Sequence, residues 1–274
     1  MALKVGLLFI TLLIGSNAFP AEESQQDMSI FFDHTDAESR IVGGNTAPAT
    51  PYMVALSQGL VLRSFTCGGS LVTVRRVLTA AHCITGISLS TGRVIVGTLR
   101  WNSGGVLYNL NSRIIHPEYS STRIKNDIGI LVTSSNVVLN NAVSLVAMNY
   151  DWVGAGVNTR VTGWGRIRAG GSLSQVLLIL QKPTVSGEQC IEVVARRAVE
   201  LNVRNVPPVD PTVEICTFLV EGRGMCNGDS GSPLVREDNG QQIGIVSWGL
   251  PCARGAPDMF VRVSSFRSWI EQNI

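Results

Sequence analysis

Residues 224–233 read GMCNGDSGSP and place Ser230 among small residues, with a carboxylate directly before it. Glycines on both sides suit a tight turn that presents the hydroxyl while neighbouring backbone N–H groups face one point. A serine hydroxyl stays protonated at neutral pH and needs an adjacent base, oriented by a third group, to act as a nucleophile. The stretch is therefore either a nucleophile turn or an ordinary polar loop, and a matching histidine and buried acid elsewhere would decide for the turn.

Of the three histidines, His82 is the best candidate for the base. His34 lies in an N-terminal stretch ahead of the folded part of the chain. His116 stands in IIHPEY, where the proline and the polar neighbours indicate an exposed turn. His82 stands in LTAAHC, at the expected end of a strand and beside a cysteine that can hold it rigidly.

Asp127 is the candidate acid, because it opens the nearly continuous apolar run DIGILV, which is typical of a buried strand. A carboxylate at that place needs a hydrogen-bonding partner, and a histidine would supply one. A turn-initiating role before the strand is the alternative. The order His82, Asp127, Ser230 differs from that of α/β-hydrolases, whose Gly-x-Ser-x-Gly pattern would also need glycine where Ser232 stands.

Seven motifs in this order resemble the chymotrypsin/trypsin family of secreted serine proteases: IVGG at 41–44, CGGSL at 67–71, TAAHC at 79–83, NDI at 126–128, GWG at 163–165, GDSG at 228–231 and SWG at 247–249. The resemblance covers residues 41–274. It implies an all-β fold of two six-stranded antiparallel barrels, with the active site in the cleft between them and a C-terminal α-helix.

The secondary-structure signals of the chain agree with such a fold. Ten short β-rich runs, one of them at 70–78, are separated by turn signals and favour an all-β architecture. Residues 264–274 instead show helical spacing, with Ser264 as the expected N-cap. We expect the linker between the barrels near residues 134–152.

The resemblance also implies a mechanism in which three side chains and two backbone groups act together. Ser230 would attack the peptide carbonyl, His82 would take and return the proton, and Asp127 would orient and stabilise the imidazolium. The backbone N–H groups of Gly228 and Ser230 would bind the oxyanion.

For the specificity pocket, the resemblance selects Gly224, Met225, Ser247, Trp248, Gly249 and Asp258. Gly224 stands where trypsins carry the aspartate of the pocket floor, and Asp258 stands where trypsin and chymotrypsin carry glycine. This combination resembles the arthropod chymotrypsin-like and collagenolytic enzymes. It implies broad cleavage after apolar or aromatic residues, with a minor basic component if Asp258 faces the pocket; a solvent-facing turn is the alternative for Asp258.

The N-terminal region predicts export and proteolytic activation. Residues 1–18 have a lysine, a short apolar run and a small-x-small end, as in a secretory signal peptide. Residues 19–40 are acidic, lack cysteine and end in Arg40 directly before Ile41. The resemblance implies an activation propeptide, cleaved by another protease after Arg40, whose removal lets the amine of Ile41 pair with Asp229. A disordered tail without a role is the alternative.

All six cysteines follow Ile41, so an exported protein is expected to form three disulfides, for which fifteen pairings exist. The resemblance selects Cys67–Cys83, Cys190–Cys216 and Cys226–Cys252. Missing Cys-x-x-Cys spacing argues against a zinc site, and the lack of acidic residues between Cys83 and His116 argues against calcium. We expect neither a metal nor another cofactor.

Charge and composition limit the classes of binding partner that we expect. The formal net charge is only +2, and the arginine pairs 75–76 and 196–197 are too isolated to predict nucleic-acid binding. We expect an extracellular monomer that meets protein or peptide substrates and protein protease inhibitors but no membrane. Lysine occurs only at positions 4, 125 and 182, which hints at an alkaline compartment such as an insect gut lumen, with codon bias as the alternative. A digestive enzyme is the main hypothesis; a non-catalytic protease homologue and a regulatory cascade protease are the alternatives.

Overall fold

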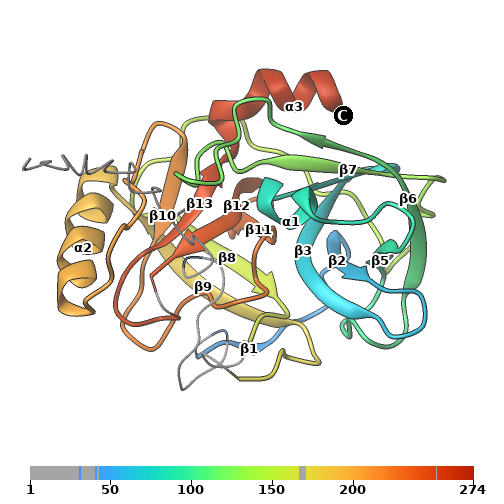
Figure 1. Ribbon diagram of the computed structural model, residues 1–274, viewed down its shortest axis with the longest axis horizontal. Helices are drawn as coiled ribbons and strands as arrows, with labels where there is room; N and C mark the ends of the chain where they lie inside the picture. The colour runs from blue at the N-terminus through green and yellow to red at the C-terminus, as the bar shows by residue number, and fades with distance from the viewer. Residues whose placement is uncertain (1–30, 32–40, 42, 167–170, 251) are drawn as a thin grey trace, which may run out of the picture.

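The computed structural model describes Phe31, Ile41 and residues 43–166, 171–250 and 252–274. The expected signal peptide at 1–18 and Arg40 lie outside the described residues, as does the expected propeptide at 19–40 apart from Phe31. The fold consists of two closed six-stranded antiparallel barrels and a C-terminal helix, which confirms the predicted fold class. In Figure 1 the cyan and green first barrel lies on the right, and the yellow to red second barrel lies on the left.

The first barrel closes in the order β2-β3-β4-β7-β6-β5. Its strands are apolar on the inner face, and β7 follows Asp127 with five consecutive buried residues, as expected for a strand covered on both faces. The strand bounds are β2 (Met53–Gln58), β3 (Ser64–Thr73), β4 (Arg76–Thr79), β5 (Gly92–Val96), β6 (Val106–Ile115) and β7 (Gly129–Thr133).

The second barrel follows the order β9-β10-β13-β12-β11-β8, and the pairing of β8 with β9 closes it. The two-residue strand β1 (Asn45–Thr46) adds to β9 on the outside of the ring. The strand bounds are β8 (Asn158–Gly163), β9 (Leu178–Val185), β10 (Glu214–Thr217), β11 (Pro233–Arg236), β12 (Gln242–Gly249) and β13 (Asp258–Arg262).

The strand expected at residues 70–78 was wrong. Residues 70–78 do not form a single strand, because the chain reverses at Val74 and Arg75 to make the hairpin of β3 and β4, with Ser70 opposite Leu78. The hairpin brings the end of β4, and with it the segment that carries His82, back toward the second barrel.

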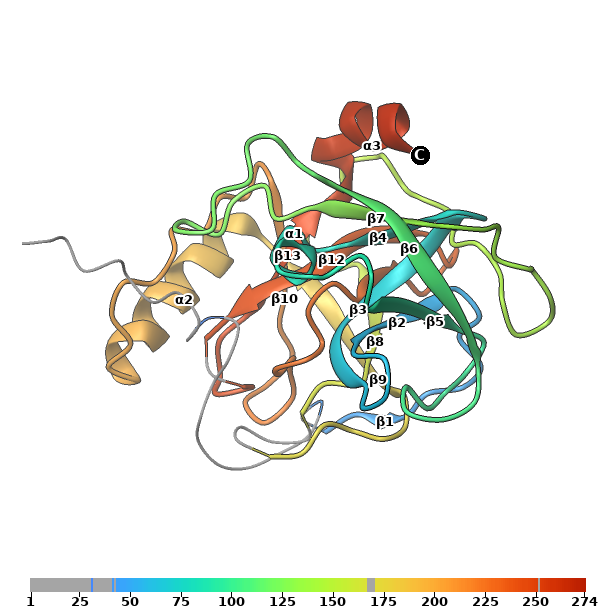
Figure 2. The ribbon, with the colours of Figure 1, turned by 45° about the vertical axis from the view of Figure 1, so that its right-hand side comes forward.

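The helices lie outside the barrels or between them. Helix α1 (Ala81–Thr85) lies between the two barrels in both ribbon views (Figures 1 and 2). At the C-terminus, the 3-10 turn η2 (Val263–Phe266) precedes α3 (Arg267–Asn273), and Ser264 lies inside the turn rather than at the expected N-cap. Helix α2 (Gly187–Glu200) is additional to the prediction. It is capped by Ser186 and packs through Cys190, Val194 and Ala198. No helix among the described residues is long and apolar enough to cross a membrane.

Candidate active site

His82 is held against Asp127 from two sides. It lies in the first turn of α1, directly after β4, and its side chain is 13% exposed. Its Nδ1 lies 2.8 Å from Asp127 Oδ2, and its backbone N–H donates to Asp127 Oδ1 at 2.9 Å. Asn126, which precedes the aspartate, has a φ of 53°, a left-handed conformation that asparagine tolerates. This turn aims Asp127 at α1 just before β7 begins.

Asp127 is buried and ionised. Its side chain is 1% exposed, and a third hydrogen bond comes from the hydroxyl of Ser247 at 2.6 Å. Burial raises the pKa of Asp127, but the adjacent His82 and the three hydrogen bonds together hold this pKa below its ordinary value. Because a carboxylate only accepts hydrogen bonds, Nδ1 of His82 carries its hydrogen and Nε2 keeps the basic lone pair of the neutral ring.

Ser230 and His82 line the same cavity of about 350 Å³. The Ser230 carbonyl accepts from the N–H of Gly68 in β3 at 2.8 Å, so the second barrel's loop rests on the first barrel. Gly231, with a φ of 78°, approaches so closely that a Cβ there would lie 2.2 Å from Thr79 Oγ1. The glycine is therefore required for this approach, and residues 228–231 form a constrained turn between the barrels rather than an ordinary polar loop.

Asp229 lies behind this turn, fully buried, and accepts hydrogen bonds from the N–H groups of Gly165 at 2.9 Å and Cys226 at 3.1 Å. Its burial raises its pKa to about 7, and the nearby charge of Asp258 adds to the effect. The side chain of Ile41 is also fully buried, in a core cluster of the second barrel that includes Met225. In the uncleaved chain Asp229 thus rests on backbone amides.

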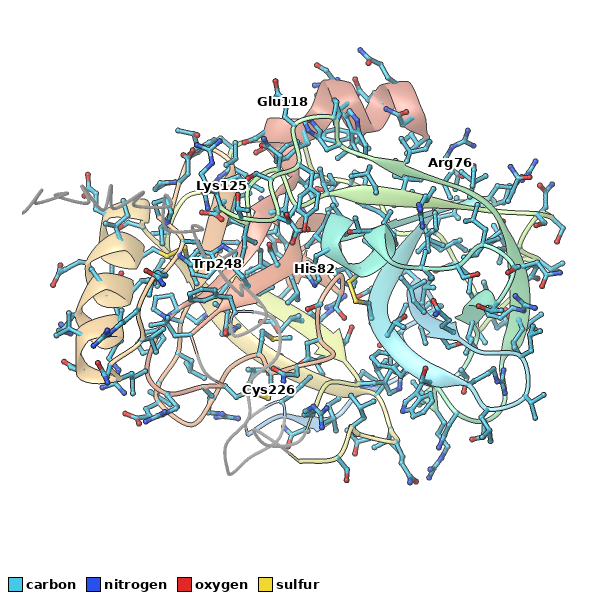
Figure 3. All side chains as sticks on the ribbon, in the orientation of Figure 1. Arg76, His82, Glu118, Lys125, Cys226 and Trp248 are labelled. Carbon is cyan, nitrogen blue, oxygen red and sulfur yellow. A yellow bond between two sulfur atoms is a disulfide. The ribbon has the colours of Figure 1, made fainter. Side chains whose placement is uncertain are left out.

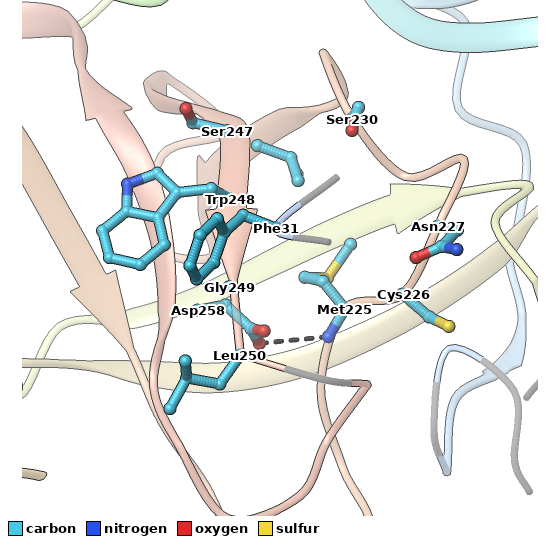
Figure 4. A pocket seen from close by; sticks show the side chains of 11 residues that line it. Phe31, Met225, Cys226, Asn227, Ser230, Ser247, Trp248, Gly249, Leu250 and Asp258 are labelled. Carbon is cyan, nitrogen blue, oxygen red and sulfur yellow. Dashed lines mark hydrogen bonds between the residues drawn. The ribbon is translucent and has the colours of Figure 1, made fainter. Parts of the chain in front are cut away.

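A second pocket lies beside Ser230, and Figure 4 shows its lining. Met225, Ser247, Trp248, Gly249 and Asp258 all line it, as the resemblance implied. Gly224 adjoins it, since a Cβ at this glycine would lie 3.0 Å from Asp258 Oδ2. Asp258 is only 6% exposed, so its solvent-facing alternative is wrong.

Two further residues at this pocket were missed by the sequence reasoning. Lys182, from β9, forms a buried ion pair with Asp258. The alternation of apolar residues along β9 could have indicated it, because Lys182 shares the inward parity of Leu178 and Leu180. Phe31 lines the pocket from the segment ahead of Arg40, and no periodic signal marks it.

The other lysine that follows Ile41, Lys125, is also paired with a buried acid. Its Nζ lies 2.8 Å from Glu214 Oε1, which also accepts from the indole N–H of Trp248 at 2.8 Å. Figure 3 shows Lys125 near Trp248, and the ammonium group lies 5.4 Å from the ring centre. The network fixes the indole that forms one wall of the pocket.

The disulfides are Cys67–Cys83, Cys190–Cys216 and Cys226–Cys252, the pairing that the resemblance selected. The first lies next to the site, with Cys83 Sγ 3.6 Å from Nε2 of His82. Cys67, His82 and Cys83 are near enough to one another to suggest a metal site. The sulfurs of Cys67 and Cys83 are bonded to each other at 2.03 Å, so neither cysteine is a thiolate that could bind a metal ion.

His116 lies apart from these groups, half-buried against the rings of Phe266 and Trp269. Burial lowers its pKa, and Glu118 partly offsets this effect. Of the three histidines, His82 is therefore the one that the described structure places beside Ser230 and Asp127.

Comparison with known proteins agrees with this arrangement. The profile of the trypsin family matches residues 41–270. The chain belongs to the trypsin family. It is 38% identical over 234 residues to chymotrypsin-2 of Vespa crabro, covering 85% of this chain and 99% of the relative. It is 39% identical over 246 residues to alkaline trypsin B of Manduca sexta, with 85% and 91% covered, and 34% identical to trypsin of Sus scrofa, with 88% and 98% covered.

This trypsin-family member is accordingly a serine endopeptidase, a hydrolase of peptide bonds. Its relatives include proteins named chymotrypsin and proteins named trypsin at similar identity. The names of these relatives therefore do not decide the specificity of this chain, which depends on the residues of its own pocket.

Proposed function

We propose that the chain is the secreted precursor of a digestive serine endopeptidase, activated by cleavage after Arg40, that cleaves peptide bonds after apolar or aromatic residues. The observation that carries the catalytic part is the contact of His82 Nδ1 with Asp127 Oδ2 at 2.8 Å, in a cavity shared with Ser230. This pair supplies the oriented base that a serine nucleophile needs.

In this mechanism the Ser230 hydroxyl attacks the carbonyl carbon of the substrate while Nε2 of His82 takes its proton. The negative charge that develops on the carbonyl oxygen is bound by the N–H groups of Gly228 and Ser230, each contributing roughly 3 to 4 kcal/mol by analogy with measured donors. His82 then returns the proton to the leaving amine, and the C–N bond breaks. Water releases the acyl group by the same steps, with His82 again as the base.

Activation would act through Asp229. In the uncleaved chain this carboxyl group accepts hydrogen bonds from two backbone amides, which lower its pKa, but burial outweighs them and raises the pKa to about 7. A new amine at Ile41 would offer a cation, and an ion pair there would hold the 228–231 turn with its N–H groups in place. Removal of residues 19–40 would be complete, because they contain no cysteine to tether them.

The pocket supports the choice of substrate. Its lining is largely apolar, and it takes up the ring of Phe31, which is 3% exposed and meets Trp248 edge-on at 6.1 Å between ring centres. An aromatic side chain at the cleaved position of a substrate would fit the same place. The extracellular setting rests on the signal-like residues 1–18, and an alkaline digestive setting on the scarcity of lysine and on the relative named alkaline trypsin.

Labelling with an organophosphate that reacts with active-site serines tests the proposal. The chain cleaved after Arg40 should be labelled on Ser230, whereas the uncleaved chain, its Arg40→Gln variant and Ser230→Ala should not. Cleaved protein without label would favour a non-catalytic homologue. Profiling with a peptide library then tests specificity, and strict cleavage after arginine and lysine would overturn the apolar preference.

A further inference from the structure

Lys182 is a buried lysine in contact with the carboxylate of the specificity pocket. Its side chain is 0% exposed, and Nζ bonds Asp258 Oδ2 within the interior of the second barrel. The sheet register explains why Lys182 and Asp258 are in contact. Thr217 of the central strand β10 lies opposite Thr184 of β9 on one side and opposite Asp258 of β13 on the other. Lys182 and Thr184 lie two residues apart and share that inner face.

Asp258 in turn reaches the pocket between two glycines. Its Oδ2 accepts from the N–H of Met225 at 3.0 Å, the contact drawn in Figure 4. A Cβ on Gly249 would lie 3.4 Å from the other carboxylate oxygen. Since neither Gly224 nor Gly249 has a side chain to cover it, this carboxylate is the charge nearest to a substrate side chain in the pocket.

We propose that Lys182 determines specificity by neutralising Asp258 from inside the barrel. Contrary to the minor basic component expected for a pocket-facing Asp258, the pocket would then select uncharged apolar and aromatic side chains and reject arginine and lysine. This inference rests on the proposed function and names its substrate class. An arginine or lysine side chain would have to share Oδ2 with the ammonium group of Lys182 and would be repelled by that group's charge. A neutral aromatic ring does not need Oδ2 and is not repelled by the ammonium group.

The test compares Lys182→Met with the double variant Lys182→Met/Asp258→Asn, each activated and normalised by titration of the active-site serine. Removing the lysine alone leaves the aspartate for a substrate cation. The ratio of kcat/KM for arginine over phenylalanine substrates should rise by about 100-fold in the single variant and return to the original value in the double variant. A fully titratable single variant with an unchanged ratio would overturn the proposal.

A measurement on the unaltered protein keeps the proposal testable if Lys182→Met does not fold. Benzamidine and benzamide have the same shape, but only benzamidine is a cation. The unaltered enzyme should bind benzamidine no more tightly than benzamide, and a preference for the cation of about tenfold or more would refute neutralisation. Failure of the proposed function itself would show differently, as absence of serine titration whatever the pocket binds.

A second, independent observation concerns Phe31. Its ring lies in the same pocket and leaves a remaining space of only about 30 Å³, room for about one water molecule. Phe31 also belongs to a core cluster with Trp248 and Leu250. Because residues 19–40 precede the expected cleavage site, we infer that the uncleaved chain occupies its own specificity pocket with Phe31, in addition to lacking the Ile41 amine.

Binding of indole, a neutral aromatic probe, tests this occupancy in the uncleaved Ser230→Ala chain. Adding Phe31→Ala should strengthen indole binding by about tenfold or more, whereas Phe32→Ala, a matched change at the neighbouring phenylalanine, should not alter it. A peptide of residues 19–40 should also inhibit the activated enzyme competitively and lose potency with the same alanine. Equal indole binding by the Phe31 and Phe32 variants, or none by either, would refute the inference.

Discussion

The hydroxyl of Ser247 donates a 2.6 Å hydrogen bond to Asp127 Oδ2, the same oxygen that lies 2.8 Å from Nδ1 of His82. The two residues are 120 positions apart and come from different barrels. One carboxylate oxygen thus ties β12 of the second barrel to the histidine of the first, and the orientation of the base depends on how the two barrels pack together.

Ser247→Ala should slow acylation without removing it. The change deletes one of three hydrogen bonds to Asp127, and we expect a loss of about tenfold in kcat, near the lower end of the 1.5 to 3 kcal/mol of a charged hydrogen bond. The pKa of Asp127 should rise, because a contact that favours its charged form is lost. Ser247→Thr, which keeps the hydroxyl, is the control. A single-turnover acylation rate equal to that of the unaltered enzyme would contradict the assigned role.

Asp127→Asn should be far more damaging although it changes few atoms. The amide oxygen can still accept from the backbone N–H of His82, which turns the amide NH₂ toward Nδ1 and forces that nitrogen to accept. Nε2 would then carry the hydrogen and could not act as the base. We expect kcat to fall by about four orders of magnitude, the size known for this change in the family. Stopped-flow acylation measures it, and urea unfolding should show a folded protein. Retention of more than a tenth of the activity would contradict the tautomer argument.

Asp229 should make the uncleaved chain less stable as the pH rises. Its folded-state pKa of about 7 lies above the ordinary 3.8, so the folded state keeps a proton that the unfolded state releases. This contribution to stability is present in full below pH 4 and is lost as the pH rises to about 7, a change of roughly 4 kcal/mol in the free energy of unfolding. Urea titrations of Ser230→Ala precursors with and without Asp229→Asn isolate it, since asparagine does not titrate.

The same substitution should have the opposite effect on function. After cleavage, Asp229→Asn leaves the Ile41 amine without a carboxylate, and we expect kcat/KM to fall by at least about 100-fold, near the roughly 3 kcal/mol lost when a buried ion pair is broken. A cleaved Asp229→Asn enzyme with normal activity would refute activation through this pair.

Two disulfides of equal loop length allow a matched comparison. Cys190–Cys216 and Cys226–Cys252 each close a separation of 26 residues, so each should contribute about 3.5 kcal/mol to stability by loop-closure entropy. The first joins α2 to β10, whereas Cys226 lines the pocket beside Ser230. Replacing either pair by serine should shift the urea midpoint by a similar amount. Only loss of Cys226–Cys252 should raise KM, by about tenfold for a phenylalanine substrate. Equal KM values in the two variants would show that the pocket wall does not depend on its bridge.

The all-β class and the candidate residues His82, Asp127 and Ser230 could be predicted because their signals are local, whereas the arrangement in two barrels followed from the family resemblance. GDSG, TAAHC and NDI each carry a chemically unusual residue between small or apolar neighbours, and the apolar run after Asp127 marks a strand without reference to the rest of the fold. The hairpin at Val74 and Arg75 was missed because its turn lacks the glycine or proline that usually marks one.

The role of Asp258 at the pocket could not be predicted from local signals. Asp258 alone is compatible with a pocket acid or a surface turn, and the choice depends on Lys182, which reaches it only across the closed barrel. Strand alternation could have placed the lysine inside, but not opposite this particular aspartate. The position of Phe31 could not be predicted either. Its ring enters a pocket formed by distant loops, and the acidic segment around it has no periodic pattern that would indicate such a contact.

The two ion pairs of Lys125 and Lys182 also bear on how the enzyme can be handled chemically. These are the only lysines after Ile41, and both face carboxylates with little or no exposure. Once residues 1–40 are gone, succinimidyl dyes and glutaraldehyde would find almost no reactive amine on the surface. Fluorescent tagging or attachment to a resin would need a lysine introduced at an exposed position, and that single site would then be modified uniquely.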